Sequence, residues 1–202
     1  MKRITLLALL ALALPLAAFA NSIDTTNSGG TLAGSTAGMT LGGSQLIAIN
    51  GFHGGGLITG NLGSVALSTG TLSSGSLQMG GTFNGGGSFV ISSTGAPHLP
   101  SGTLFNGSFT GQVTWTLVTL ANGTHNYTLS GAVSGTWYNG LVVDGATTQL
   151  TINTGRGFFN GTTSISSGDT NIVTSVPEPG TLGLLGTGLV GIAGAMHRKF
   201  KS

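Results

Sequence analysis

Apolar and polar residues alternate along short segments of this chain, and glycine interrupts nearly every segment. From Val113 to Leu117 every second side chain is apolar, which places one apolar row on a single face of a β-strand. Residues 121–125 are typical of a turn, and the alternation resumes in residues 127–133, so the two segments are expected to pair as an antiparallel hairpin. We expect Trp115 to pack across the strands of this hairpin.

The rest of the body, residues 21–176, shows the same kind of pattern. No window keeps an apolar period of 3.6, and Lys, Glu and Arg are almost absent, so helices are not expected there. Tight turns are indicated by Asn-Gly dipeptides and by one Asp-Gly dipeptide, which begin at Asn50, Asn84, Asn106, Asn122, Asn139, Asn160 and Asp144. Further strands are expected within residues 44–49, 65–67, 88–91, 147–152 and 162–166.

The fold class expected is therefore all-β, as an antiparallel sandwich, jelly roll or barrel of many short strands. Degenerate Gly-Thr repeats near Gly70, Gly81 and Gly102 leave a parallel β-helix as a minority interpretation. Residues 24–43 are poorer in aromatic and branched side chains, and they are expected to form a sheet edge or a loosely ordered lead-in.

The N-terminal 20 residues have the three parts of a secretory signal peptide. Lys2 and Arg3 give a positive start, residues 4–14 are apolar, and Ala18-Phe19-Ala20 is an A-x-A cleavage site. A transmembrane anchor is the alternative, but the apolar run is short for a hydrocarbon core of roughly 30 Å. We expect export and removal of residues 1–20 by signal peptidase.

The C-terminal end has three parts in a fixed order: a proline motif, an apolar segment and a basic cluster. Pro177, Glu178 and Pro179 precede Gly180, and the two prolines keep this piece out of helix and sheet interiors and accessible to an enzyme. Residues 181–196 are expected to form a transmembrane helix of roughly 24 Å. Residues 197–202 then form a basic cytoplasmic tail, with its charges on Arg198, Lys199 and Lys201.

This arrangement, over residues 176–201, resembles the PEP-CTERM sorting signal. The resemblance implies that an exosortase, a membrane-embedded protease or transpeptidase, recognises Pro177, Glu178 and Pro179 as the sorting motif. It also implies transient insertion in the inner membrane, followed by release to the cell surface or the extracellular space, and association with exopolysaccharide and biofilm. A permanent C-terminal anchor behind a proline-rich linker is the alternative.

Composition changes this picture in two ways. The formal net charge of +2 comes from basic residues at the two ends, while the body carries only Asp24, Asp144, Asp169 and Arg156, so nucleic-acid binding is not expected. The chain has no cysteine, which excludes disulfides and thiolate chemistry. With 38 glycines and many Ser, Thr and Asn residues, the surface must be rich in hydroxyl and amide groups.

No catalytic, cofactor or metal site is indicated, and the body is not expected to be an enzyme. The three aspartates have no acidic neighbours in sequence, and no serine lies in a G-x-S-x-G elbow. His53, His98 and His125 lack metal-ligand spacing and are expected to be solvated loop residues. Of the adjacent Trp137 and Tyr138, one is expected in the core and the other exposed.

The sequence thus predicts an exported surface or matrix protein, structural or polysaccharide-associated. A carbohydrate-binding module and a secreted carbohydrate-active hydrolase are the alternatives. The hydrolase would need two of the three aspartates to converge in a cleft.

Overall fold

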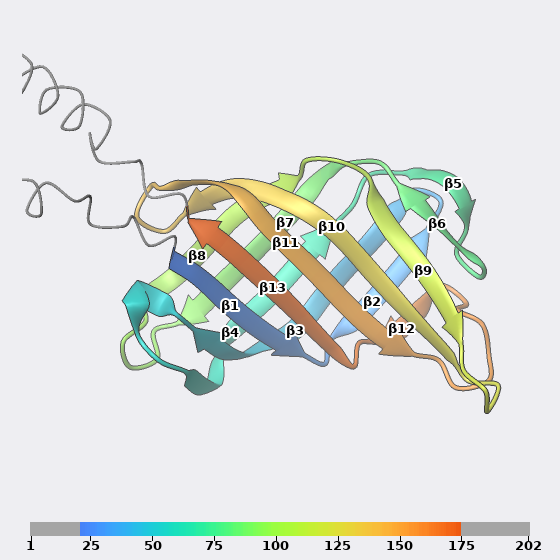
Figure 1. The fold of residues 1–202 in the computed structure, drawn as a ribbon, viewed down its shortest axis with the longest axis horizontal. Coiled ribbons are helices and arrows are strands. Elements are labelled where there is room, and N and C mark those ends of the chain that lie inside the picture. Colours follow the sequence, from blue (N-terminus) through green and yellow to red (C-terminus); the bar gives the residue numbers. More distant parts are fainter. Residues whose placement is uncertain (1–20, 175–202) are drawn as a thin grey trace, which may run out of the picture. The chain divides into compact units, whose positions relative to one another are not determined.

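The computed structural model describes residues 21–174, and these form an all-β body (Figure 1). One short 3-10 turn, η1 (Phe52–Gly54), accompanies the strands. No helix among residues 21–174 is long and apolar enough to cross a membrane. The strands are β1 (Asn21–Ser28), β2 (Thr31–Ser35), β3 (Gly38–Asn50), β4 (Ile58–Ser68), β5 (Leu72–Ser76), β6 (Gly80–Phe83), β7 (Gly86–Thr94), β8 (Ser101–Phe109), β9 (Val113–Thr119), β10 (His125–Trp137), β11 (Val142–Asn153), β12 (Thr162–Ser164) and β13 (Ser167–Thr174).

Eight of these strands close into an antiparallel barrel. Their order around the wall is β11-β13-β1-β3-β4-β7-β8-β10, and β10 pairs back with β11 to complete the circle. The long strands β3 and β10 each change partner along their length. The first half of β10 pairs with β9 and the second half with β8, while β3 pairs first with β2 and then with β1. At one end, therefore, the wall is extended by the short strands β9-β6-β5 and β2-β12.

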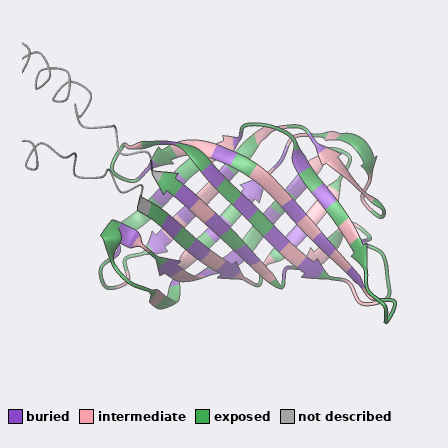
Figure 2. Ribbon diagram, viewed as in Figure 1, coloured by how far each residue is buried: buried purple, intermediate pink, exposed green. Residues whose placement is uncertain are grey.

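Buried and exposed residues alternate along the strands of the barrel (Figure 2), and most of the buried side chains are apolar and fill its inside. Phe105 and Phe109 each approach Phe89 edge to face, with ring centroids 6.0 and 6.2 Å from it. An eight-stranded barrel has an interior just wide enough for side chains to fill. Large aromatic rings and branched aliphatic side chains accordingly fill the core, and no disulfide contributes to it.

Two aromatic residues close the extended end of the barrel. The rings of Trp115 and Tyr127 stack with centroids 4.8 Å apart. Trp115 Nε1 donates to the carbonyl oxygen of Leu77 at 2.8 Å, and Tyr127 Oη donates to that of Gln78 at 2.7 Å. Tyr127 Oη also accepts a hydrogen bond from the backbone N–H of Phe159 at 3.1 Å. The polar tips of the two rings thus fix the β5–β6 turn and the β11–β12 loop to the wall.

One face of the interior is polar. Thr25, Thr148 and Thr170 are buried on β1, β11 and β13, and Thr170 Oγ1 donates to Thr148 Oγ1 at 2.9 Å. Asn27 Nδ2 donates to Ser44 Oγ at 2.7 Å beside them. Every buried polar side-chain atom in residues 21–174 has a hydrogen-bond partner, so these groups are accommodated without the penalty of an unmade bond.

Gly63 shows why glycine is needed inside the wall as well as in turns. It has φ +154, and a Cβ built on it would lie 1.8 Å from the carbonyl oxygen of Ser92 on β7. A side chain at this position would push β4 and β7 apart.

The structure confirms the all-β, antiparallel class and selects the barrel among the three architectures expected. The β9–β10 hairpin and the packing of Trp115 across it are also confirmed. The parallel β-helix is wrong, because every strand pairing among residues 21–174 is antiparallel. The expectation that residues 24–43 form an edge or a loose lead-in is wrong too, since β1 lies inside the closed wall between β13 and β3. The expected signal peptide, residues 1–20, and the expected transmembrane helix, residues 181–196, lie outside the described residues.

Candidate functional site

A continuous polar face covers the outside of five neighbouring strands, β9, β10, β11, β13 and β1. Because the strands are in register, their outward side chains line up in a row across the wall. Adjacent strands lie about 4.8 Å apart, so five strands give a row of roughly 19 Å. This row consists of Thr114, Ser130, Gln149, Asp169 and Thr26.

A second row runs parallel to the first, two residues nearer to the end of the barrel where β1 begins, and it extends the face to the neighbouring strand β3. It consists of Thr147, Asn171, Asp24 and Asn50 on β11, β13, β1 and β3. All of the side chains in both rows are exposed or half-exposed. We call the two rows together the polar face.

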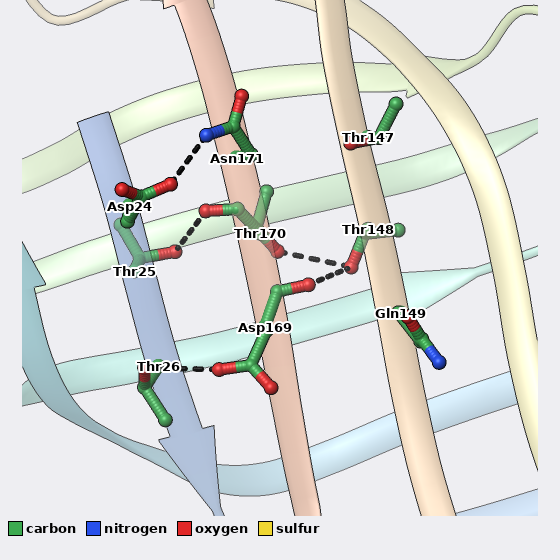
Figure 3. Close-up of a pocket in the computed structure, with 9 residues that line it drawn as sticks. All are labelled: Asp24, Thr25, Thr26, Thr147, Thr148, Gln149, Asp169, Thr170 and Asn171. Carbon is green, nitrogen blue, oxygen red and sulfur yellow. Dashed lines mark hydrogen bonds between the residues drawn. The ribbon is translucent and has the colours of Figure 1, made fainter. Parts of the chain in front are cut away.

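The polar face is indented over β1, β13 and β11, where Asp24 and Asp169 lie in the same shallow hollow (Figure 3). Asn171 Nδ2 donates to a carboxylate oxygen of Asp24, and Thr26 Oγ1 donates to a carboxylate oxygen of Asp169 at 3.0 Å. Asp24 and Asp169 are diagonal neighbours on adjacent antiparallel strands, a relation that typically separates residues by roughly 7–8 Å.

Buried hydroxyl groups support this hollow from below. Thr25 Oγ1 donates to the carbonyl oxygen of Thr170 at 3.4 Å, and Thr148 Oγ1 donates to that of Asp169 at 3.5 Å. With the Thr170–Thr148 hydrogen bond, these contacts tie β1, β13 and β11 together behind the carboxylates (Figure 3). The spacing of the outward side chains is therefore set by the wall and not by flexible loops.

The chemistry of the polar face is that of a hydrogen-bond acceptor surface without a cation. Carboxylates are acceptors only, while amides and hydroxyls both donate and accept. Arg156, the only Lys or Arg among residues 21–174, lies in the loop after β11 and not among these strands. No group of three or more His, Cys, Asp or Glu side chains in residues 21–174 could hold a metal ion. The face is suited to a neutral ligand rich in hydroxyl groups.

Asp144, the third aspartate, is exposed on β11 but does not line this hollow. It falls where the β10–β11 register shifts, so Asp144-Gly145 is part of an irregularity within a strand and not the turn expected. Asn106-Gly107 lies inside β8 and likewise forms no turn.

The three histidines occupy two different environments. His53, in η1, and His98, in the β7–β8 loop, line one hollow at the end of the barrel where β1 begins. His125 was expected in a solvated loop, but this is wrong: it is the first residue of β10 and is buried. Its Nδ1 lies 3.0 Å from Thr119 Oγ1, and its ring stacks on Phe158.

The expectation for the aromatic pair is confirmed, since Trp137 is buried and Tyr138 is 37% exposed. The polar face itself was missed at the sequence level, apart from Asp24 and Asp169. The alternation of polar residues in β1, β11 and β13 marks which side chains point outward. It does not say which strands are neighbours.

The residues expected to direct sorting lie outside the described part of the chain. These are Ala18 and Ala20 for signal cleavage, Pro177, Glu178 and Pro179 for the sorting motif, and Arg198, Lys199 and Lys201 for the basic tail.

Comparison with known protein families matches residues 175–199 to the PEP-CTERM protein-sorting motif. The family resemblance seen at the C-terminus is thereby confirmed, and the body is assigned to no family. No curated protein and no solved structure matches the chain.

Proposed function

From the PEP-CTERM sorting motif that this chain carries at residues 175–199, we propose a route of export in two processing steps. Signal peptidase removes residues 1–20 during export. Residues 181–196 then hold the protein transiently in the inner membrane, with Arg198, Lys199 and Lys201 on the cytoplasmic side. An exosortase-like protease or transpeptidase cuts near Pro177, Glu178 and Pro179, and the body passes to the cell surface or the extracellular space.

For the body, we propose a non-enzymatic, polysaccharide-associated role in the extracellular matrix, of the kind found in biofilms. The polar face is the observation that supports it. Sugar hydroxyls need acceptors that are fixed in space, and Asp24, Asp169 and Gln149 supply carboxylate and amide oxygens on a rigid wall. With two carboxylates and no cation, the face favours a neutral polysaccharide over a uronic acid or sulfated one.

The hydrolase alternative gains one argument from the structure, because Asp24 and Asp169 share a hollow. Against it, the hollow is open and lies on the outer wall of the barrel, so its described residues do not enclose a sugar ring to distort it. Each carboxylate also receives a hydrogen bond from a neutral neighbour. We therefore favour binding over cleavage.

The sorting proposal is tested by the intact mass of the protein from its own host, with membrane and extracellular fractions analysed separately. The expected extracellular form begins at Asn21 and ends close to Pro177–Pro179. Glu178→Ala is expected to leave the full C-terminus on the protein and to shift it to the membrane fraction. An extracellular mass that retains residues 181–202 would contradict processing.

The binding proposal is tested by equilibrium binding of the processed body to the neutral polysaccharide fraction of its host. The double variant Asp24→Asn, Asp169→Asn is expected to weaken binding at least about 10-fold, the equivalent of 1.4 kcal/mol. Asp144→Asn is the control, because it removes a carboxylate away from the hollow, and it is compared with each single variant as well as with the double one. Equal binding by all variants would reject the polar face as the site, and release of new reducing ends by the wild type would reject the non-enzymatic role.

A further inference from the structure

Eight large apolar side chains are exposed in residues 21–174. Four of them lie at the end of the barrel where β1 begins and β13 ends, which is the end that leads to the C-terminal segment. The other four, Met79, Val118, Leu120 and Phe158, lie toward the opposite end. Leu57 in the β3–β4 loop is 67% exposed, and Val142 at the start of β11 is 59% exposed. Tyr138 in the β10–β11 loop and Val173 near the end of β13 are also exposed. We call these four residues the apolar rim. They contrast with the hydroxyl and amide groups of the polar face.

The loops that carry the rim are braced against each other across the barrel mouth. Phe52 stacks on His53 with ring centroids 4.4 Å apart and on Tyr138 at 5.8 Å. A ring nitrogen of His53 forms a hydrogen bond with Tyr138 Oη. Phe52 itself is buried next to Trp137, with ring centroids 6.0 Å apart. The β3–β4 and β10–β11 loops therefore present Leu57 and Tyr138 from a packed base.

Charge excludes one kind of partner for this surface. No Lys or Arg of the described chain lies at this end, since Arg156 is in the loop that follows the opposite end of β11. Asp144, two residues beyond Val142, is the nearest charged side chain in the sequence. Lys and Arg thus supply no attraction to anionic lipids or acidic polymers at this end, where His53 and His98 are the only side chains of the described residues that can become cationic, and apolar contact is what the rim offers.

The apolar segment of residues 181–196 follows closely in the chain after the end of the barrel that bears the rim. Six residues, 175–180, separate Thr174 at the end of β13 from the apolar segment 181–196. Fully extended, six residues reach at most roughly 20 Å. While residues 181–196 are inserted in a bilayer, the end of the barrel that bears the rim is held within that distance of the headgroups.

We propose that the apolar rim docks on the lipid surface while the C-terminal segment is inserted, and so holds residues 177–179 at the level where a membrane-embedded enzyme cuts. This inference rests on the transient membrane insertion of the proposed function. Leu57, Val142 and Tyr138 enter the interfacial region, where apolar and aromatic side chains are favoured. Because the contact is uncharged, it forms on zwitterionic lipid and is insensitive to salt.

Single-cysteine variants test this directly, because the natural chain has no cysteine. Leu57→Cys and Val142→Cys are each labelled with an environment-sensitive fluorophore in the chain after signal cleavage, residues 21–202. The labelled protein is reconstituted into phosphatidylcholine vesicles that contain a headgroup nitroxide quencher. Met79→Cys is the matched control, because Met79 is also 67% exposed but lies beyond β5, at the opposite end of the barrel.

Docking is expected to quench the labels at 57 and 142 at least about 3-fold more than the label at 79, at low and at high salt alike. Equal quenching at all three positions, with vesicle flotation showing that the chain is anchored, overturns docking but leaves the sorting proposal standing. Failure of the chain to float with vesicles overturns docking together with transient insertion. Protection of the labels at 57 and 142 by host polysaccharide in the absence of lipid would assign the rim to a glycan and overturn lipid docking.

Discussion

Removal of the hydroxyl oxygen of Tyr127 is expected to lower the free energy of unfolding of the body substantially. Tyr127→Phe keeps the ring that stacks on Trp115 and removes only Oη, which bonds both the Gln78 carbonyl and the Phe159 N–H. Phe159 is buried, so its N–H is left without a partner away from water, which costs about 1–3 kcal/mol. Gln78 is exposed, and water replaces the lost bond to its carbonyl at a cost of about 0.5–1 kcal/mol.

The expected loss is therefore about 1.5–4 kcal/mol in the free energy of unfolding of the body. For a domain of this size that corresponds to a fall in Tm of roughly 3–16 °C. Urea unfolding of residues 21–175, followed by far-UV circular dichroism, measures it without relying on the fluorescence of the neighbouring Trp115.

Tyr138→Phe provides the control, since it makes the same chemical change at an exposed tyrosine, whose hydrogen bond to His53 is open to solvent and can be replaced by water. We expect that variant to stay within about 0.5 kcal/mol of the wild type. If Tyr127→Phe and Tyr138→Phe unfold at the same urea concentration, the two hydrogen bonds of Tyr127 do not hold the extended end of the barrel, and the reasoning fails.

Two further predictions concern the wall and its polar interior. Gly63→Ala should cost about 3 kcal/mol or more, because its Cβ would strike the backbone of β7, whereas Gly42→Ala on β3 has open space and should change stability by less than about 1 kcal/mol in the same urea assay. Thr148→Val should cost about 1–2 kcal/mol by leaving the buried Thr170 hydroxyl without its acceptor. Adding Thr170→Val should recover part of that loss, and a double-mutant cycle that shows simple additivity would contradict the pairing.

The parts of the fold that the sequence predicts are the local ones. The β9–β10 hairpin follows from the alternation of Val113, Trp115 and Leu117 and from one short turn, because its strands are adjacent in the chain. Pairing of β1 with β13 joins Asn21 to Thr174, and no local pattern indicates it. The polar face depends on this long-range pairing. The sequence can therefore indicate its individual residues, but it does not predict that they lie together.

An Asn-Gly dipeptide does not mark a turn where its glycine serves another purpose. Gly51, Gly123 and Gly140 follow asparagine and have positive φ in turns, as expected. Gly107 also follows asparagine, yet it lies within β8 and is needed because a Cβ there would come within 2.2 Å of the carbonyl oxygen of Ser134. Sequence alone does not distinguish a glycine that is needed for a positive φ from one that is needed because a neighbouring strand leaves no space for a Cβ.

The place of β13 in the wall also sets the order of events during export. Strands β11 and β1 are both hydrogen-bonded to β13, so the cylinder stays open along one seam until Ser167–Thr174 has arrived. A chain that crosses a membrane N-terminus first therefore completes its barrel only with the last strand, six residues before the apolar segment begins. On the proposed route, closure of the barrel would therefore require that the whole body has been translocated. Cleavage near residues 177–179 would then act on a body whose last strand is already available for folding.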